Sequence, residues 1–180
     1  NTLSKLKKYE EAIVCYDRGL KIKPNDFLLL RNKANDLDDF KKYEEAIVYF
    51  DKALEIKPND FTSLKNKGIA LNNFKKYEEA IVCYDKALEI KPNNNDILFL
   101  KGNSMSAQKK DEESMKYYNE VLRVNPKHVG ALNNKGNTLS RLKKYEEAIV
   151  CYDKALDIEP KYTKALNNKA DSLDDLRKYK

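Results

Sequence analysis

The spacing of the prolines is the strongest constraint on what this chain can fold into. All five prolines follow one another at intervals of 34 residues: Pro24, Pro58, Pro92, Pro126 and Pro160. Self-similarity at one fixed period is typical of stacked-repeat proteins, in which each unit packs against its neighbours. With the proline at position 32 of a unit, we expect one array over 1–180. Its complete units are 27–60, 61–94, 95–128 and 129–162, and its partial units are 1–26 and 163–180.

Two stretches of helical periodicity divide each unit. In 27–60 apolar residues recur every three or four positions, first at Leu30, Ala34, Leu37 and Phe40 and then at Ala46, Ile47, Phe50, Ala53 and Leu54. Such spacing places each group on one stripe of an amphipathic helix. Lys41-Lys42 separates the two groups. Glu44 and Glu45 lie at the start of the second helix, where their negative charge interacts favourably with the helix dipole, and the proline ends that helix. Each unit is therefore predicted to be a helical hairpin.

The second predicted helix resembles a known repeat family. The run Tyr43-Glu44-Glu45-Ala46-Ile47 is followed by an aromatic residue four positions after the alanine, then by Ala-Leu and the proline, and the pattern returns every 34 residues. It is similar to the tetratricopeptide repeat over the whole chain. The resemblance implies an all-α fold, an α-solenoid of tandem helix-turn-helix repeats in a right-handed superhelix. It also implies a non-enzymatic scaffold that binds proteins or peptides.

Two positions of the first helix depart from the family pattern. Position 4, often tryptophan, is leucine, and position 7, often leucine, is lysine: Lys33, Lys67, Lys101, Lys135 and Lys169. Because position 7 lies within the apolar stripe, we expect each stem to pack and each ammonium group to reach solvent. Position 8 is always small, at Ala34, Gly68, Gly102, Gly136 and Ala170, which predicts close approach of backbones.

A longer period lies above the first. The segment from Asn1 to Pro24 is almost the same as the segment from Asn137 to Pro160. A module of four repeats has therefore been duplicated, and we expect this chain, which lacks an initiator Met, to be a piece of a longer array. Apolar residues at its two ends are predicted to be partly uncovered and to promote end-to-end self-association: Leu3, Leu6, Leu166, Leu173 and Leu176.

Patterns for catalysis and metal binding are missing from the sequence. The one histidine, His128, lies in a predicted loop, where we expect it to be solvated. No phosphate-binding loop, zinc-protease helix or nucleophile elbow is present, and the paired glutamates open helices, where dipole compensation explains them. We therefore predict no enzyme activity, no cofactor and no metal site.

The three cysteines argue against a disulfide framework. Cys15, Cys83 and Cys151 occupy position 23 of alternate units, and Tyr49 and Tyr117 hold that position in the units between. Second helices two units apart lie about 20 Å apart when neighbours are spaced by roughly 8–10 Å, and a disulfide spans only about 7 Å. We expect buried or half-buried thiols and a reducing compartment, the cytoplasm. The sequence has no stretch that could span a membrane and no signal peptide.

Asparagines gather on the face of the first helix opposite its apolar stripe. At about 100° per residue this face holds positions 2, 6, 9 and 13, with position 5 at its margin. The resemblance implies that it lines a concave groove. Position 6 is Asn32, Asn66, Asn134 and Asn168, interrupted by Leu100; position 9 is Asn1, Asn35, Asn103 and Asn137; position 5 includes Arg31, Lys65 and Phe99. An amide can pair with peptide N–H and C=O groups. The face is therefore a candidate peptide site, although a general richness in asparagine would look the same.

Other binding functions fit less well. A clamp for the C-terminal carboxylate of chaperone tails, as some family members have, would use Arg31, Asn35 and Asn66, but it would then meet Asp96 and Leu100 where basic residues are needed. A net charge of +6 and a row of Lys-Lys or Arg-Lys pairs at the predicted hairpin turns, the first at Lys7-Lys8 and the last at Arg177-Lys178, could attract nucleic acid. Carboxylates stand beside these pairs, except at the last one, and argue against that function. A structural spacer or self-assembling rod with no groove ligand remains an alternative.

The unit at 95–128 departs from the others. Asp111 replaces the tyrosine at the turn and Ser114 and Val121 replace alanines, while Phe99 and Leu100 place apolar groups on the groove face. The unit is either a joint within the array or an apolar foothold for a partner side chain, and we favour the joint.

Overall fold

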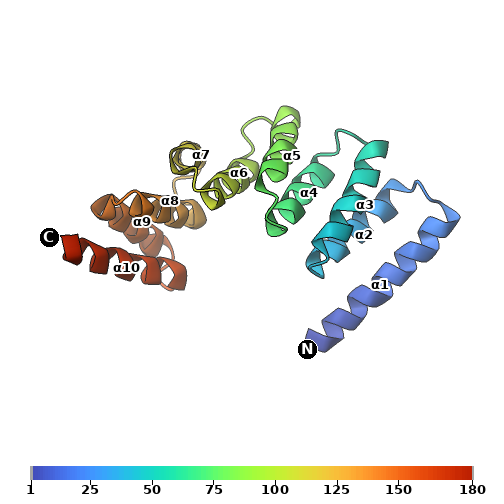
Figure 1. The fold of residues 1–180 in the computed structure, drawn as a ribbon, viewed down its shortest axis with the longest axis horizontal. Helices are drawn as coiled ribbons and strands as arrows, with labels where there is room; N and C mark the ends of the chain where they lie inside the picture. Colours follow the sequence, from blue (N-terminus) through green and yellow to red (C-terminus); the bar gives the residue numbers. More distant parts are fainter. Residues whose placement is uncertain (1, 180) are drawn as a thin grey trace. The chain divides into compact units, whose positions relative to one another are not determined.

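Helices are the only regular secondary structure in the part of the chain that the computed structural model describes, residues 2–179, with side chains for 8–178. The helices divide into two compact units, Asn1–Pro92 and Asn93–Lys180. Figure 1 shows α1 (Thr2–Ile22), α2 (Phe27–Asp39), α3 (Tyr43–Ile56), α4 (Phe61–Asn73) and α5 (Tyr77–Ile90) in the first unit. The second unit holds α6 (Asn95–Ala107), α7 (Asp111–Val124), α8 (Val129–Arg141), α9 (Tyr145–Ile158) and α10 (Thr163–Tyr179). The predicted all-α class is confirmed.

Neighbouring helices pair into tandem hairpins. In the first unit α2 packs against α3 and α4 against α5, and α3 and α4 join the two hairpins. In the second unit α6 packs against α7 and α8 against α9, with α7 and α8 in contact between them. First helices also touch one another, α2 with α4 and α6 with α8, and α8 with α10. Within each unit the first helices therefore form one wall, which we call the first-helix wall.

The predicted turns lie at the Lys-Lys pairs of the complete hairpins. Lys41 adopts the left-handed conformation with a φ of 61°, and Lys42 N–H donates to the Leu37 carbonyl at 2.8 Å. Glu44 and Glu45 occupy the first turn of α3, where a negative charge favours the helix dipole. The left-handed region costs a non-glycine residue roughly 1–2 kcal/mol. Packing of the two helices must offset this cost.

The predicted turns at the two ends of the chain are wrong. The α1 helix runs without interruption through Lys7-Lys8, and α10 runs through Arg177-Lys178. Neither pair has both complete helices of a hairpin beside it, so no packing offsets a left-handed lysine. Lysine, arginine and leucine are good helix formers, and the backbone therefore stays helical.

Polar side chains cap the first helices. Asp26 accepts from the N–H groups of Leu28 and Leu29, and Asp60 accepts from that of Ser63. His128 does the same for α8, because its Nδ1 accepts from the Ala131 N–H at 3.1 Å. The predicted loop position of His128 is correct, but the side chain is half-buried: it caps α8, and its ring lies against another aromatic residue, described below.

A ring at position 24 fills the space left by the small residue at position 8. A Cβ added to Gly68 would lie 2.4 Å from Cε1 of Tyr84, and one added to Gly136 would lie 2.4 Å from Cε1 of Tyr152. The first complete unit combines Ala34 with Phe50 in one buried cluster. Close approach at position 8 is thus between a helix backbone and an aromatic side chain of the same hairpin, and not simply between two backbones.

We expect Gly68→Ala to lower the free energy of unfolding by about 1–3 kcal/mol, the usual cost of overpacking a core. Its methyl group would overlap the Tyr84 ring, and urea denaturation followed by circular dichroism measures the effect. The double variant Gly68→Ala with Tyr84→Phe reproduces the Ala34 and Phe50 pair and should regain much of the loss. A single variant as stable as the unmodified protein would contradict this account of the packing.

Candidate functional site

Asparagines of successive first helices bond to one another in the first unit. Nδ2 of Asn66 on α4 donates to Oδ1 of Asn35 on α2 at 2.9 Å. Arg31 lies beside them over the Phe27 ring, 5.3 Å from its centroid, and 4.0 Å from an oxygen of Asp60. The other two predicted site residues of this unit, Asn32 and Lys65, are half-buried on the same helices.

The second unit repeats this bond and adds tyrosine hydroxyls to it. Nδ2 of Asn134 on α8 donates to Oδ1 of Asn103 on α6 at 2.8 Å, and the Tyr118 hydroxyl donates to the same oxygen at 3.0 Å. The Tyr152 hydroxyl donates to Oδ1 of Asn137 at 2.9 Å. Tyr118 and Tyr152, which fill the cores of these two hairpins, therefore also orient amides of the wall.

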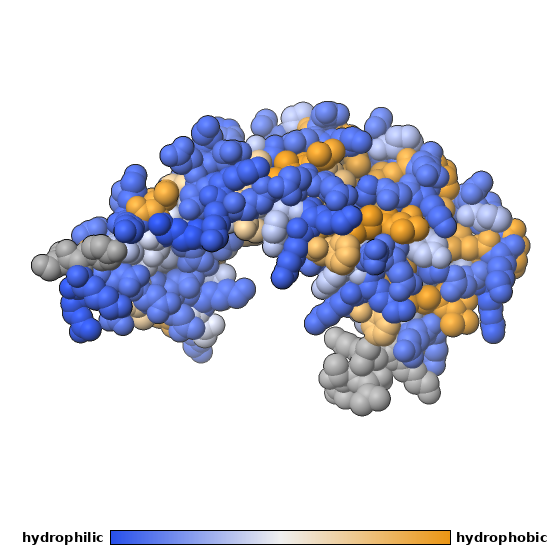
Figure 2. Space-filling view, in the orientation of Figure 1, coloured by the Kyte–Doolittle hydropathy of each residue, from blue (hydrophilic) through white to orange (hydrophobic). Residues whose placement is uncertain are grey.

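A cavity of about 270 Å³ lies at this point, and we call it the Asn103 pocket. It brings three predicted site residues together with four that sequence reasoning missed. Its lining consists of Asn103, Ser106, Ala107, Tyr118, Asn134, Asn137 and Arg141. The face of the molecule seen in Figure 2 is mainly hydrophilic, with separate hydrophobic patches.

Arg141 is the most informative of the missed residues. Its Nε and Nη2 donate to Oδ1 of Asp111 at 3.0 and 2.5 Å, and Nη2 also donates to Ser106 Oγ at 2.7 Å. Asp111 is the residue that replaces the usual tyrosine at the turn, so the aspartate and the arginine of the following first helix form an inter-repeat ion pair. The departure at position 17 and the basic residue at position 13 were both visible in the sequence, but nothing there linked them.

The remaining predicted residues have other partners. Nδ2 of Asn168 donates to Oδ1 of Asn133 at 3.0 Å, one position away from the predicted row. The Phe99 ring lies 4.6 Å from the His128 ring and 6.3 Å from that of Tyr118, between centroids, and Leu100 is half-buried. Because Phe99 is engaged by two rings of its own unit, its geometry fits a joint between hairpins better than a foothold for a partner.

The sequence predicts that the ammonium groups of the lysines at position 7 reach solvent, but four of them are held by hydrogen bonds to the preceding repeat. Each of four donates to position 25 of the preceding repeat: Lys33 to Asp17, Lys67 to Asp51, Lys135 to Asn119 and Lys169 to Asp153. Burial alone lowers the pKa of Lys33, but its hydrogen bonds to Asp17 and Tyr49 outweigh burial, so the net pKa is raised. For the buried Lys33, the interaction with the Asp17 carboxylate offsets the free-energy cost of removing the ammonium group from water.

The thiols are free, as predicted, but their burial differs. Cys83 and Cys151 are buried, whereas Cys15 on α1 is exposed. Burial raises the pKa of the Cys83 and Cys151 thiols, so both are protonated at neutral pH. The expectation of a buried or half-buried side chain is wrong for Cys15.

Family comparisons agree with this architecture. A family model described as tetratricopeptide repeat matches residues 1–26, 28–60, 62–94 and 129–162, and a second model of the same description matches 96–128. The chain belongs to the tetratricopeptide repeat family. The family assignment predicted from the hairpin sequence is thereby confirmed. A comparison with curated proteins found no match.

Solved tetratricopeptide proteins have similar folds. YrrB, described as a tetratricopeptide protein with an unusual peptide-binding site, is 25% identical with a TM-score of 0.79, over 94% of this chain and 88% of its own. MamA from Desulfovibrio magneticus RS-1 is 21% identical with a TM-score of 0.80, over 86% and 87%. The first tetratricopeptide domain of Spaghetti (RPAP3), bound to the HSP90 peptide SRMEEVD, is 27% identical with a TM-score of 0.62, over 65% and 93%. None of the helices within residues 2–179 of this repeat protein is long and apolar enough to cross a bilayer.

The buried tyrosines predict loss of stability at alkaline pH. Burial raises the pKa of Tyr118 and of Tyr152 to about 12, whereas the pKa of a tyrosine in an unfolded chain is about 10. Their contribution is therefore complete below about pH 10 and is lost as pH rises towards about 12. Urea denaturation between these pH values should show a falling free energy of unfolding. Tyr152→Phe should make the decline shallower, and an unchanged slope would contradict the assignment.

Proposed function

We propose that this chain is a non-enzymatic scaffold that binds an extended peptide along its first-helix wall, with the Asn103 pocket as the centre of the site in the second unit. The observation that carries the proposal is the polarity of the amides there. Oδ1 of Asn103 accepts from Tyr118 and Asn134, and Oδ1 of Asn137 accepts from Tyr152. Their oxygens are thus occupied within the protein.

The nitrogens of these same two side-chain amides, unlike the oxygens, are not engaged within the part of the chain that the structure describes. Among the described residues, Nδ2 of Asn103 and Nδ2 of Asn137 make no hydrogen bond, nor does Nη1 of Arg141. Each of these groups is a donor only. The pocket therefore offers several N–H groups to a ligand rich in acceptors, and the carbonyl groups of an extended peptide are such acceptors.

The repeat spacing fits a peptide. An extended chain advances about 3.3 Å per residue, and neighbouring helices lie roughly 8–10 Å apart. Equivalent asparagines would then meet about every third residue of the ligand. Contacts of this kind involve the peptide backbone, so they favour extended conformation over a particular side-chain sequence.

Two of the similar structures support a peptide as the ligand, since one is described as having an unusual peptide-binding site and the other holds an HSP90 peptide. The chaperone tail itself is a poor candidate ligand here. Asp96 and Leu100 stand where such a clamp would need basic residues, and an aspartate would repel a carboxylate.

Nucleic acid is also a poor candidate. The lysines at the turns pair with glutamates of the following helix, Lys42 with Glu45 at 3.4 Å and Lys76 with Glu79 at 3.3 Å. These exposed pairs set a negative charge beside the second lysine of each turn, which weakens the attraction of this edge for phosphates. We propose a cytoplasmic location, which free thiols in all three cysteines support.

Changing the donors of the Asn103 pocket tests the proposed function. In the double variant Asn103→Asp with Asn137→Asp, each tyrosine hydroxyl keeps its acceptor oxygen, but each outward N–H is replaced by a carboxylate oxygen. Peptides would be selected on the unmodified protein from a random 12-residue display library, and fluorescence anisotropy would give their Kd values. We expect the double variant to bind at least about tenfold more weakly, as for loss of hydrogen bonds with added repulsion.

The matched control is Asn94→Asp. This residue caps α6 through its side-chain oxygen, and the equivalent caps of α2 and α4 are already aspartates. The control adds a negative charge to the same unit without touching the pocket, so its Kd should be unchanged. Failure to select any peptide, or equal binding by the double variant, would refute the proposed function.

A second candidate function, self-assembly, rests on the two incomplete hairpins. Leu166 and Leu173 on α10 are each 46% exposed, whereas their equivalents Leu132 and Leu139 on α8 are buried. Within the described residues α10 is a first helix that no second helix follows, and α1, with its exposed Cys15, carries a second-helix sequence. Leu176 is half-buried, and the side chains of Leu3 and Leu6, together with Asn1, lie outside the described residues. We propose that α10 of one copy packs against α1 of another.

Sedimentation velocity over a range of protein concentrations tests this association. We expect the mean sedimentation coefficient to rise with concentration, because burial of apolar surface favours contact between the two ends. The variant Leu166→Lys with Leu173→Lys should remain monomeric. Its control, Val82→Lys, changes an exposed valine on α5 and should associate like the unmodified protein. A monomer at every concentration would exclude self-assembly of this chain.

A further inference from the structure

Position 23 alternates between tyrosine and cysteine, and this alternation controls what covers the lysine at position 7. In the first complete hairpin the Tyr49 hydroxyl accepts from Lys33 Nζ at 2.7 Å, and Nζ lies 4.0 Å from the centroid of the Tyr49 ring. In the second unit Lys101 Nζ lies 4.8 Å from the centroid of the Tyr117 ring. Both lysines are buried. A tyrosine at position 23 therefore forms a lid over its lysine.

The hairpin of α4 and α5 has no such lid. Cys83 stands at position 23, and its short side chain leaves Lys67 more accessible: the Lys67 side chain is 21% exposed, compared with 5% for Lys33. Lys67 keeps its ion pair with Asp51, at 2.5 Å. The phenol that accepts a second hydrogen bond from Lys33 thus has no counterpart at Lys67.

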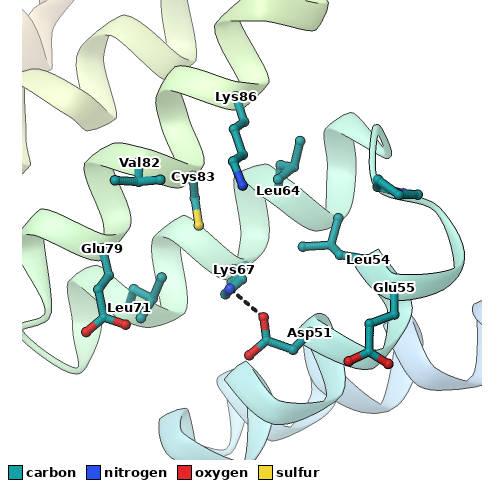
Figure 3. A pocket seen from close by; sticks show the side chains of 11 residues that line it. Asp51, Leu54, Glu55, Leu64, Lys67, Leu71, Glu79, Val82, Cys83 and Lys86 are labelled. Carbon is teal, nitrogen blue, oxygen red and sulfur yellow. Dashed lines mark hydrogen bonds and ion pairs between the residues drawn. The ribbon is translucent and has the colours of Figure 1, made fainter.

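A cavity of about 660 Å³ occupies the place of the absent ring, and we call it the Cys83 pocket. Figure 3 shows Lys67 on α4 and Cys83 on α5 facing this space, with Asp51 on α3 across from Lys67. The equivalent cavity one repeat earlier is smaller, about 490 Å³. Tyr49 is part of its lining, and Lys33 is not. The protein thus contains a version of the site that a tyrosine ring partly fills and a version that is open.

We propose that the Cys83 pocket binds the side chain of a tyrosine from a partner protein. The ring would take the place that Tyr49 takes one repeat earlier, and its hydroxyl would accept a hydrogen bond from Lys67 Nζ. Leucine and valine side chains supply apolar walls for the ring: Leu54, Leu64, Leu71 and Val82.

Charge in the pocket favours a neutral ring over an anion. Lys67 is already paired with Asp51, and the rest of the lining contains one lysine, Lys86, and two carboxylates, Glu55 and Glu79. An anionic ligand would meet more negative than positive charge. A phenol needs only one donor and apolar surface, and a ring close to an ammonium group gains a cation–π contact as well.

The Cys83 thiol contributes surface and not reactivity. Burial raises the pKa of this thiol, so it remains protonated at neutral pH and behaves as a small apolar group. The tyrosine site is also independent of the proposed peptide site. It is formed largely by second helices, α3 and α5, and by the inward face of α4, and no asparagine of the first-helix wall lines it.

The experiment uses N-acetyltyrosine amide as the probe and the full chain labelled with ¹⁵N. Titration should produce saturable shifts of the Lys67, Val82 and Cys83 amide signals. N-acetylphenylalanine amide, which lacks only the hydroxyl, should bind about tenfold more weakly, since it buries the Lys67 ammonium group without supplying a second acceptor beside Asp51. Saturable shifts elsewhere only, or equal affinity for the two probes, would overturn the proposal.

Two exchanges between the filled and the open site complete the test. Cys83→Tyr places an internal ring in the pocket, as two other repeats already have, and should abolish the shifts. Tyr49→Cys opens the smaller cavity and should add a second set of saturable shifts at Lys33 and Val48. Binding retained by Cys83→Tyr, or no second site in Tyr49→Cys, would refute the tyrosine site. Asn137→Asp should leave probe binding unchanged, which separates this outcome from failure of the peptide site.

Discussion

The packing of one aromatic ring against one small residue sets the geometry of each hairpin. The ring at position 24 lies where a Cβ at position 8 would be, as for Tyr152 against Gly136, and this fixes the separation of the two helices. The same ring carries the hydroxyl that orients Asn137. Where the ring is Phe50, Asn35 has no hydroxyl to accept from and takes only the bond from Asn66. In the hairpins of Tyr118 and Tyr152, core packing and the polarity of the first-helix wall therefore depend on the same residue.

Polar contacts between successive repeats supply the register that apolar stripes alone would leave loose. The ion pair of Lys67 with Asp51 and the hydrogen bond between the side-chain amides of Asn66 and Asn35 each join one repeat to the next. They lie on different faces of the same first helix. At the divergent repeat, Asn119 replaces the aspartate partner of Lys135, and the ion pair of Arg141 with Asp111 supplies a charge contact elsewhere. A buried charge that loses its partner is costly, so a repeat shifted by one helical turn would be penalised at several positions at once.

The proline period and the apolar stripes were enough to predict the hairpins and the family, because both depend on local patterns that repeat. The predicted array boundaries remain a prediction. The turns predicted near the two ends of the chain were wrong. A turn at Lys7-Lys8 needs two helices packed against each other, which a local sequence pattern does not reveal. The site was predicted in part: helical angle placed Asn103, Asn134 and Asn137 on one face, but their hydrogen-bond partners come from another helix or repeat. Arg141 and the lid formed by Tyr49 were missed for the same reason, since each depends on a residue 16 or 30 positions away.

The left-handed lysines at the turns have a consequence for how the chain assembles. Lys41, Lys75, Lys109 and Lys143 all hold a positive φ, and none is a glycine. A nascent turn is therefore unfavourable by itself and becomes stable only when both helices are present. We expect cooperative growth, in which a completed hairpin nucleates the next and the terminal helices fray first. Gain or loss of whole 34-residue units would preserve this cooperativity, whereas a cut within a unit would not.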